Sequence, residues 1–191
     1  MIKENRKLSK GTILDHDVWE HPNLAVTCAL VTKRPDGKLT FLTQTRGTGA
    51  ADFKGSLCFA CGYYDFKDQY VRLAASRELY EETGYQVDPG DLKFAGISDG
   101  LHTNLGNITL RFVAWVETPK DHETVDNGRG GEEDEVSGLT WYDLDWIQSN
   151  KERFCFTHDS FAQEIADNLD RILAGGYYMD RWDQEKPERN V

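Results

Sequence analysis

Three glutamates crowd into the last turn of one predicted helix. The helix is expected over residues 70–83 and ends at Gly84. At about 100° per residue, Glu78, Glu81 and Glu82 fall within one arc of about 100°. Each like-charge pair at these spacings costs about 0.2–0.5 kcal/mol, and each acid at the negative end of the helix dipole costs about 0.3–1 kcal/mol more. A helix with a purely structural role gains nothing from this arrangement, so it indicates a functional site.

A hard divalent cation would relieve the repulsion, because Mg²⁺ prefers carboxylate and water oxygens. The same helix face carries Val71, Ala74 and Ala75, so we expect a small-walled surface beside the acids. Arg77 is the cation closest in sequence. The alternative is a solvated acidic face, which is common on helix surfaces, and spacing alone does not choose between the two.

Strands are expected on both sides of this helix. Residues 24–31 predict a buried strand, 36–37 a hairpin turn and 39–45 an alternating partner strand. Further strands are expected over 92–98, 108–117 and 139–142, and 56–62 is a short apolar segment ending in a turn. Ser160 and Gln163 form a capping box that predicts the start of a last helix, which Gly175 and Gly176 end. This order predicts an α/β (α+β) fold with a mixed sheet between helices.

The 191 residues suffice for one domain. We expect an N-terminal arm over 1–22, a single domain over 23–176 and a tail over 177–191. No apolar run reaches the roughly 18–20 residues of a membrane helix, and the N-terminus has no apolar signal core. These features predict a soluble, cytoplasmic protein without membrane contact.

The charge balance argues against nucleic-acid binding. Lys and Arg number 22 and Asp and Glu number 33, which gives a net charge of -11 and repels phosphate backbones. The net charge does not exclude small phosphorylated ligands, because bound divalent cations reverse the negative potential of an acidic cleft.

The four cysteines are too few and too scattered for a disulfide scaffold. Cys58 and Cys61 form a C-x-x-C, but Cys28 and Cys155 supply no second pair with zinc-site spacing. We therefore interpret all four as ordinary half-buried thiols.

The glutamate segment resembles the Nudix box of the Nudix hydrolases, G-x5-E-x7-R-E-U-x-E-E-x-G-U, where U is a bulky apolar residue. Residues 77–85, R-E-L-Y-E-E-T-G-Y, match its second half, with Tyr85 in place of the usual aliphatic residue. The similarity covers residues 23–174, including a turn at 59–62, an acidic loop and a Trp-bearing strand. The resemblance implies a Nudix-like α/β/α sandwich.

The chain departs from the pattern in two places. Arg77 lies fifteen positions after Gly62 instead of fourteen, so the loop is one residue longer. The first Glu of the pattern is absent, since counting forward from Gly62 reaches Asp68 and counting back from Arg77 reaches Gln69. In the family that Glu is taken to brace the arginine, so we expect weaker support of this loop.

The resemblance implies that Glu78, Glu81 and Glu82 hold Mg²⁺ or Mn²⁺. Arg77 would orient Glu78 through a charge-assisted hydrogen bond. The metal would neutralise phosphate oxygens and lower the pKa of bound water.

A general base must also take a proton from the attacking water, and many family members use an acid on a distant loop. The loop at 131–135 offers four acids. Glu135 is the first choice because it lies six residues before Trp141, and Glu132 and Glu133 follow. Most of this run is expected to be solvated.

Other polar positions have less specific expectations. Arg46 either meets a substrate phosphate or ends a strand in solvent, and Gly62 is expected to contact substrate. His158 is expected to pack or cap the last helix. His102 and Asn104 lie on a loop, where ligand contacts are common.

The expected function is metal-dependent hydrolysis of the pyrophosphate bond in a nucleoside diphosphate linked to a group X, such as ADP-ribose, a nucleotide sugar or a dinucleotide. One alternative, an RNA 5′-end pyrophosphohydrolase or decapping enzyme, is disfavoured by the net charge. Another, a non-catalytic nucleotide-sensing Nudix module, is disfavoured by the intact box acids. The sequence does not specify the group X. No proline lies between Gly90 and Glu117, where the ADP-ribose subfamily tends to carry one. A homodimer stays open.

Overall fold

Strand β1 (Leu24–Lys33) is the centre of the sheet because both of its faces are apolar and buried. Val26, Cys28 and Leu30 belong to one hydrophobic core, and Ala29 and Val31 belong to another. A strand that is buried on both faces needs a covering layer on each side. The structure is a computed structural model and describes residues 24–98, 107–117 and 134–175.

Within the described residues the sheet is mixed and has seven strands. The spatial order is β3-β2-β1-β6-β5, with β4 paired to β1 and β7 paired to β2. Strands β1 and β6 run parallel, and the other pairs are antiparallel. The remaining strands are β2 (Leu39–Arg46), β3 (Leu57–Cys58), β4 (Ala60–Tyr63), β5 (Lys93–Ser98), β6 (Ile108–Trp115) and β7 (Val136–Asp143).

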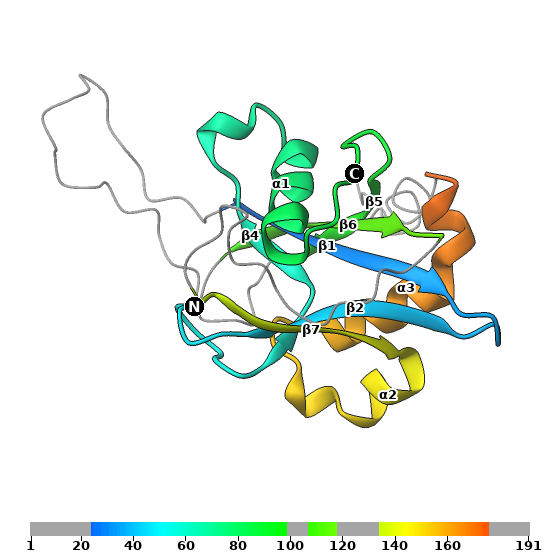
Figure 1. Ribbon diagram of the computed structural model, residues 1–191. Helices are drawn as coiled ribbons and strands as arrows, with labels where there is room; N and C mark the ends of the chain where they lie inside the picture. The colour runs from blue at the N-terminus through cyan, green and yellow to red at the C-terminus, as the bar shows by residue number, and fades with distance from the viewer. Residues whose placement is uncertain (1–23, 99–106, 118–133, 176–191) are drawn as a thin grey trace, which may run out of the picture.

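Helices cover the two faces of this sheet (Figure 1). Helix α1 (Val71–Thr83) packs Ala74, Ala75 and Leu79 into the first core. Helix α3 (His158–Leu173) packs its apolar stripe into the second core, together with α2 (Leu144–Ser149). Two 3₁₀ turns, η1 (Phe66–Asp68) and η3 (Lys151–Arg153), precede α1 and α3. The predicted mixed sheet between helices is confirmed.

The structure differs from the sequence prediction at several elements. Strand β7 begins at Val136 instead of residue 139, because it pairs with β2 along most of that strand's length. Helix α2 was not expected, and Asp143 begins it by accepting a hydrogen bond from Trp146 N–H. The segment 56–62 forms two short strands, β3 and β4, on either side of the buried Phe59.

The predicted capping box at Ser160 is wrong. Helix α3 begins two residues earlier at His158, and no side chain caps it. The preceding Thr157 has φ 60°, so the chain enters the helix through a left-handed residue. Ser160 Oγ instead donates to the carboxylate of its neighbour Asp159. The end of α3 was predicted correctly, since Gly175 follows it with φ 80°. No helix in the described ranges has the length and apolar character needed to span a bilayer.

Candidate functional site

The three box glutamates lie at the C-terminal end of α1, which Gly84 ends in a left-handed conformation with φ 73°. Their burial differs sharply. The side chains of Glu78 and Glu81 retain 13% and 19% of their exposure, whereas Glu82 is 3% exposed. No basic residue lies in the last turn of α1. The charge that compensates the acids therefore comes from one turn earlier in the helix.

Arg77 supplies that charge. Its Nη1 donates to Glu78 Oε1 at 2.8 Å and to Glu81 Oε2 at 2.9 Å. Its Nη2 donates to the carbonyl of Tyr63 at the end of β4 at 3.1 Å. Arg77 thereby holds Glu78 and Glu81 next to each other through one oxygen of each carboxylate. Its bond to the Tyr63 carbonyl connects α1 to β4.

Asp68 braces Arg77 in turn. Its two carboxylate oxygens accept from Arg77 Nε at 2.8 Å and Nη2 at 2.9 Å, a bidentate pair. The guanidinium lowers the pKa of Asp68, whose side chain is 3% exposed. The expected loss of support for this loop is therefore wrong, because Asp68 makes the contact assigned to the missing Glu. The following Gln69 has φ 61°, so the extra residue lies where the chain turns into α1.

Gly62 lies directly against Glu78. A Cβ built on Gly62 would come closer than 3.0 Å to three atoms of the Glu78 carboxylate. Gly62 is paired with Val26 within the sheet, so its backbone has no room to retreat. The close approach of the Glu78 carboxylate explains why position 62 is a glycine. The substrate contact expected for Gly62 stays a prediction.

Glu82 points into the protein beneath this pair. Its Oε2 accepts a hydrogen bond of 2.7 Å from Cys61 N–H. Its Oε1 and the buried Oε1 of Gln44 both lack a hydrogen-bond partner among the described residues, although the two side chains interact. Burial raises the pKa of Glu82 well above its usual value. A buried oxygen without a partner is costly, so this position favours a proton or a cation.

Burial also raises the pKa of Glu78 to about 7, against the opposing charge of Arg77. The negative charge of Glu135 adds to this shift, so the structure brings Glu135 close to the box glutamates. The backbone of Glu135 is fixed by a hydrogen bond of 2.6 Å from Gly47 N–H. Glu132 and Glu133 lie outside the described residues.

Arg46 does not end its strand in solvent. It is 6% exposed, and its guanidinium donates to the carbonyl and the carboxylate of Asp52 at 3.0 Å each. It also lies over the ring of Phe156, 5.3 Å from the centroid. A contact with a substrate phosphate, which stays a prediction, would compete with the Asp52 pair.

His158 packs as expected. It is 2% exposed, its ring stacks on Phe59, and its Nδ1 accepts from Phe59 N–H at 2.9 Å. His102 and Asn104 lie outside the described residues. The cysteines depart from the sequence interpretation, because Cys28, Cys58 and Cys155 are buried and only Cys61 is half-buried.

Sequence reasoning missed Asp68 as the arginine brace and Gln44 as the neighbour of Glu82. Counting forward from Gly62 does reach Asp68, so that signal was present but ambiguous by one residue. Gln44 lies on β2 opposite Cys58, and no local pattern marks it.

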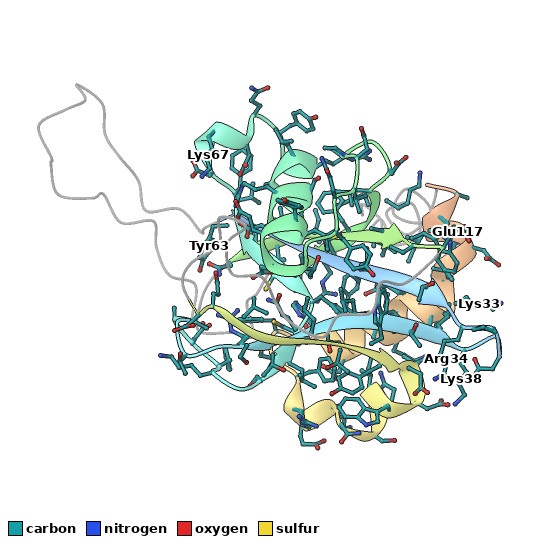
Figure 2. The ribbon with its side chains drawn as sticks, viewed as in Figure 1. Lys33, Arg34, Lys38, Tyr63, Lys67 and Glu117 are labelled. Atoms are coloured by element: carbon teal, nitrogen blue, oxygen red, sulfur yellow. The ribbon has the colours of Figure 1, made fainter. Side chains whose placement is uncertain are left out.

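Figure 2 shows Tyr63 and Lys67 beside α1, whereas Lys33, Arg34 and Lys38 lie at the far end of the sheet in this view.

The donor set has the chemistry of a divalent-cation site. Carboxylate oxygens suit Mg²⁺ or Mn²⁺, and Glu82 Oε1 has no hydrogen-bond partner among the described residues. Within the described ranges, however, no three such side chains already converge on one point. Arg77 Nη1 binds one carboxylate oxygen of Glu78 and one of Glu81, so these glutamates fit a cation chemically through the carboxylate oxygens that Nη1 does not use.

Known structures share this fold. The NUDIX domain of Shewanella oneidensis NrtR, complexed with ADP ribose, is 17% identical, with a TM-score of 0.63, over 78% of this chain and 90% of that one. A C. elegans Ap4A hydrolase is 16% identical, with a TM-score of 0.53, over 78% and 98%. A bifunctional NMN adenylyltransferase/ADP ribose pyrophosphatase from Francisella tularensis, complexed with AMP and a Mn ion, is 17% identical, with a TM-score of 0.59, over 77% and 42%.

At these identities the likeness establishes the fold alone. No curated protein sequence matches the chain. The family description "NUDIX domain" matches residues 21–165, which is most of the 191 residues. That match includes the arginine and the three glutamates of α1. The chain therefore belongs to the Nudix family.

Proposed function

We propose that this chain hydrolyses the pyrophosphate bond of a nucleoside diphosphate linked to a second group, with Mg²⁺ or Mn²⁺ as cofactor. Nudix hydrolases generally act on pyrophosphate bonds and use divalent metals. The observation that supports the proposal here is the arrangement of Glu78 and Glu81 around Arg77 Nη1, with Glu82 buried beside them. Three acids this close need a cation beyond one arginine.

Glu78, Glu81 and Glu82 would hold the metal ion. When bound, such an ion neutralises the charge of the phosphates and activates water. Arg77 positions Glu78 and Glu81, and Asp68 positions Arg77 through its bidentate pair. The partly exposed Glu78 and Glu81 face a ligand more readily than Glu82 does, so Glu82 contributes through its single unpartnered oxygen.

Glu135 is the proposed general base. Its charge acts on Glu78, which supports a position near the box, where a general base could take a proton from bound water. The hydrogen bond from Gly47 N–H to its carbonyl fixes its backbone. A carboxylate so placed takes the proton from the attacking water while the phosphate leaving group departs.

The substrate class rests on the charge of the chain and on the structural neighbours. A net charge of -11 disfavours a long RNA and leaves small nucleotides. The NrtR domain binds ADP ribose, and the C. elegans neighbour is an Ap4A hydrolase. ADP-ribose, nucleotide sugars and dinucleotides are therefore the first compounds to test.

The test is a hydrolysis screen over these compounds with Mg²⁺ and with EDTA, with products identified by mass. We expect metal-dependent release of a nucleoside monophosphate from at least one of them. In the same assay Glu135→Gln should lower kcat by about 10²-fold or more with little change in KM, because a general base acts in the transition state. Wild-type kcat in Glu135→Gln would assign the base elsewhere, with Glu132→Gln and Glu133→Gln as the next variants.

A further inference from the structure

The fold gathers three of the four cysteines at one place. Cys58 ends β3, Cys61 lies in β4, and Cys155 precedes α3. The thiol of Cys58 interacts with the thiols of Cys155 and Cys61 and with the imidazole of His158. Cys28 lies in β1, in the hydrophobic core shared with α1. All four are free thiols, so the cluster of Cys58, Cys61 and Cys155 is reduced in this structure.

The backbone sets Cys58 and Cys155 side by side. Leu57 and Phe154 form a parallel bridge, and Cys155 N–H donates to the Leu57 carbonyl at 3.0 Å. Cys58 and Cys155 are the next residues on the two segments. Neighbouring segments paired in this way lie about 4.8 Å apart, and disulfides join residues whose Cα atoms are about 4.4–6.8 Å apart. The Sγ of Cys155 also lies 3.5 Å from the Leu57 carbonyl oxygen.

The C-x-x-C pair is less well placed. Cys58 and Cys61 lie in one largely extended run, in which residues three apart are separated by up to about 10 Å. At full extension the Cα separation would exceed the roughly 7 Å above which a disulfide requires backbone movement. Cys155 is therefore the better partner for Cys58.

The surroundings favour thiol chemistry over metal binding. His158 Nδ1 is used by Phe59 N–H and its Nε2 faces Thr27 Oγ1 at 3.5 Å. Neither ring nitrogen is free to complete a zinc site, and no metal-ready group of Cys, His, Asp or Glu occurs in the described part of the chain. The buried guanidinium of Arg46 acts on all three thiols, and a neighbouring positive charge stabilises a thiolate.

We propose that Cys58 and Cys155 are an oxidation site that forms an intramolecular disulfide when the protein meets a peroxide. The peroxide transfers one oxygen to a thiolate of the pair, giving a sulfenic acid, and its other oxygen leaves as water. The neighbouring thiol then attacks that sulfur and gives up its proton, the S–S bond forms and the sulfenic oxygen leaves as a second water. In total, two thiols and one hydrogen peroxide give one disulfide and two waters.

The bond would connect β3 to the segment before α3. Gln44 Nε2 now donates to Cys58 Sγ at 3.4 Å, and Cys61 N–H holds Glu82. The disulfide would therefore lie next to Gln44 and near Cys61, the residues that contact Glu82, the buried glutamate of the candidate site. It closes a long loop of the chain, so the oxidised protein should unfold at a temperature higher by on the order of 5 °C.

The experiment uses the full chain, purified in reducing conditions and treated with hydrogen peroxide while folded. Free thiols are then alkylated in denaturant and the protein is digested and mapped by mass spectrometry. We expect two of the four thiols to disappear, a linked peptide pair containing Cys58 and Cys155, and a rise in Tm that a reductant reverses. Cys155→Ala should form no disulfide after peroxide, whereas the matched variant Cys28→Ala should still form the bond.

Other outcomes overturn the proposal. The first is a Cys58–Cys61 linkage, and the second is retention of all four thiols under peroxide that oxidises the urea-unfolded chain. The third is a stoichiometric zinc ion on the purified protein. If Cys155→Ala fails to fold, the peptide map of the unsubstituted chain decides alone.

Discussion

The carboxylate of Glu78 occupies the space that a side chain on Gly62 would fill. Gly62 belongs to β4 and Glu78 to α1, so the absence of a side chain at position 62 leaves room for this carboxylate beside the strand. A residue with any side chain at 62 would push away one of the acids that the proposed function needs.

Gly62→Ala should therefore displace the Glu78 carboxylate at only a small cost in stability, because the group that must move is the end of a flexible side chain. We also expect Mg²⁺ binding, measured by calorimetry, to weaken at least tenfold. Gly138→Ala is the matched control, since Gly138 is also a strand glycine but has its nearest neighbour at 4.0 Å. Equal metal affinity in the two variants would contradict this account of Gly62.

Asp68→Asn tests the brace on Arg77. The substitution removes the charge from a bidentate pair whose acid is buried, so we expect a loss of about 1.5–3 kcal/mol and a fall in Tm of about 5 °C. Hydrolytic activity should fall as well, because Arg77 loses its orientation. Asp65→Asn, three residues upstream on the exposed side of the same turn, should cost less than about 1 kcal/mol. Equal losses would show that Asp68 supports only the turn.

Glu82→Gln should stabilise the metal-free protein, whereas Glu81→Gln should not. The amide introduced at position 82 keeps an acceptor for Cys61 N–H, and its NH₂ group can donate to the unpartnered Oε1 of Gln44. Glu81→Gln instead removes an ion pair with Arg77. We expect Tm in EDTA to rise by about 2–4 °C for each kcal/mol gained in Glu82→Gln, and to stay level or fall in Glu81→Gln. A lower Tm for Glu82→Gln would contradict the assignment of a strained, buried carboxyl.

The gain in Glu82→Gln should depend on pH. Because the folded-state pKa of Glu82 is raised, the unsubstituted protein loses stability as the pH rises above the unfolded value near 4.3. The advantage of the Glu82→Gln variant should therefore be absent at pH 4 and grow towards pH 8. Urea unfolding at several pH values in EDTA measures it, and a gain independent of pH would point to packing instead of charge.

Metal affinity should also follow the ionisation of Glu78. Its pKa of about 7 means that protons compete with a cation near neutral pH. Lowering the pH from 7 to 6 should weaken Mg²⁺ binding by up to about tenfold at constant ionic strength. Calorimetry between pH 6 and 8 tests this, and a flat affinity would remove Glu78 from the metal ligands.

Much of the fold could be predicted from local sequence. The apolar run of β1, the alternation in β2, the helical period of α1 and α3, and the glycines at 84 and 175 are all encoded within a few residues. Helix α2 was missed because six residues are too short to show a period. The start of α3 was misplaced because tertiary contacts of His158, not a local cap, determine it.

The site was predicted in part. Helical spacing groups Glu78, Glu81 and Glu82, but it cannot show that Glu82 is buried while the other two share Arg77. The one-residue insertion hid the role of Asp68, because counting forward from Gly62 and counting back from Arg77 reach different residues. The proximity of Cys155 to Cys58 depends on a bridge between segments nearly a hundred residues apart, which no spacing rule contains.

Hydrolysis in ¹⁸O-labelled water tests the central claim most directly. ADP-ribose is incubated with the protein and Mg²⁺, and both products are weighed by mass spectrometry. We expect AMP and ribose phosphate, with ¹⁸O in one of the two phosphates only, and no reaction in EDTA. ADP-ribose, dinucleotides and nucleotide sugars that bind in the presence of Mg²⁺ or Mn²⁺ yet return intact and unlabelled would contradict it and identify a nucleotide sensor.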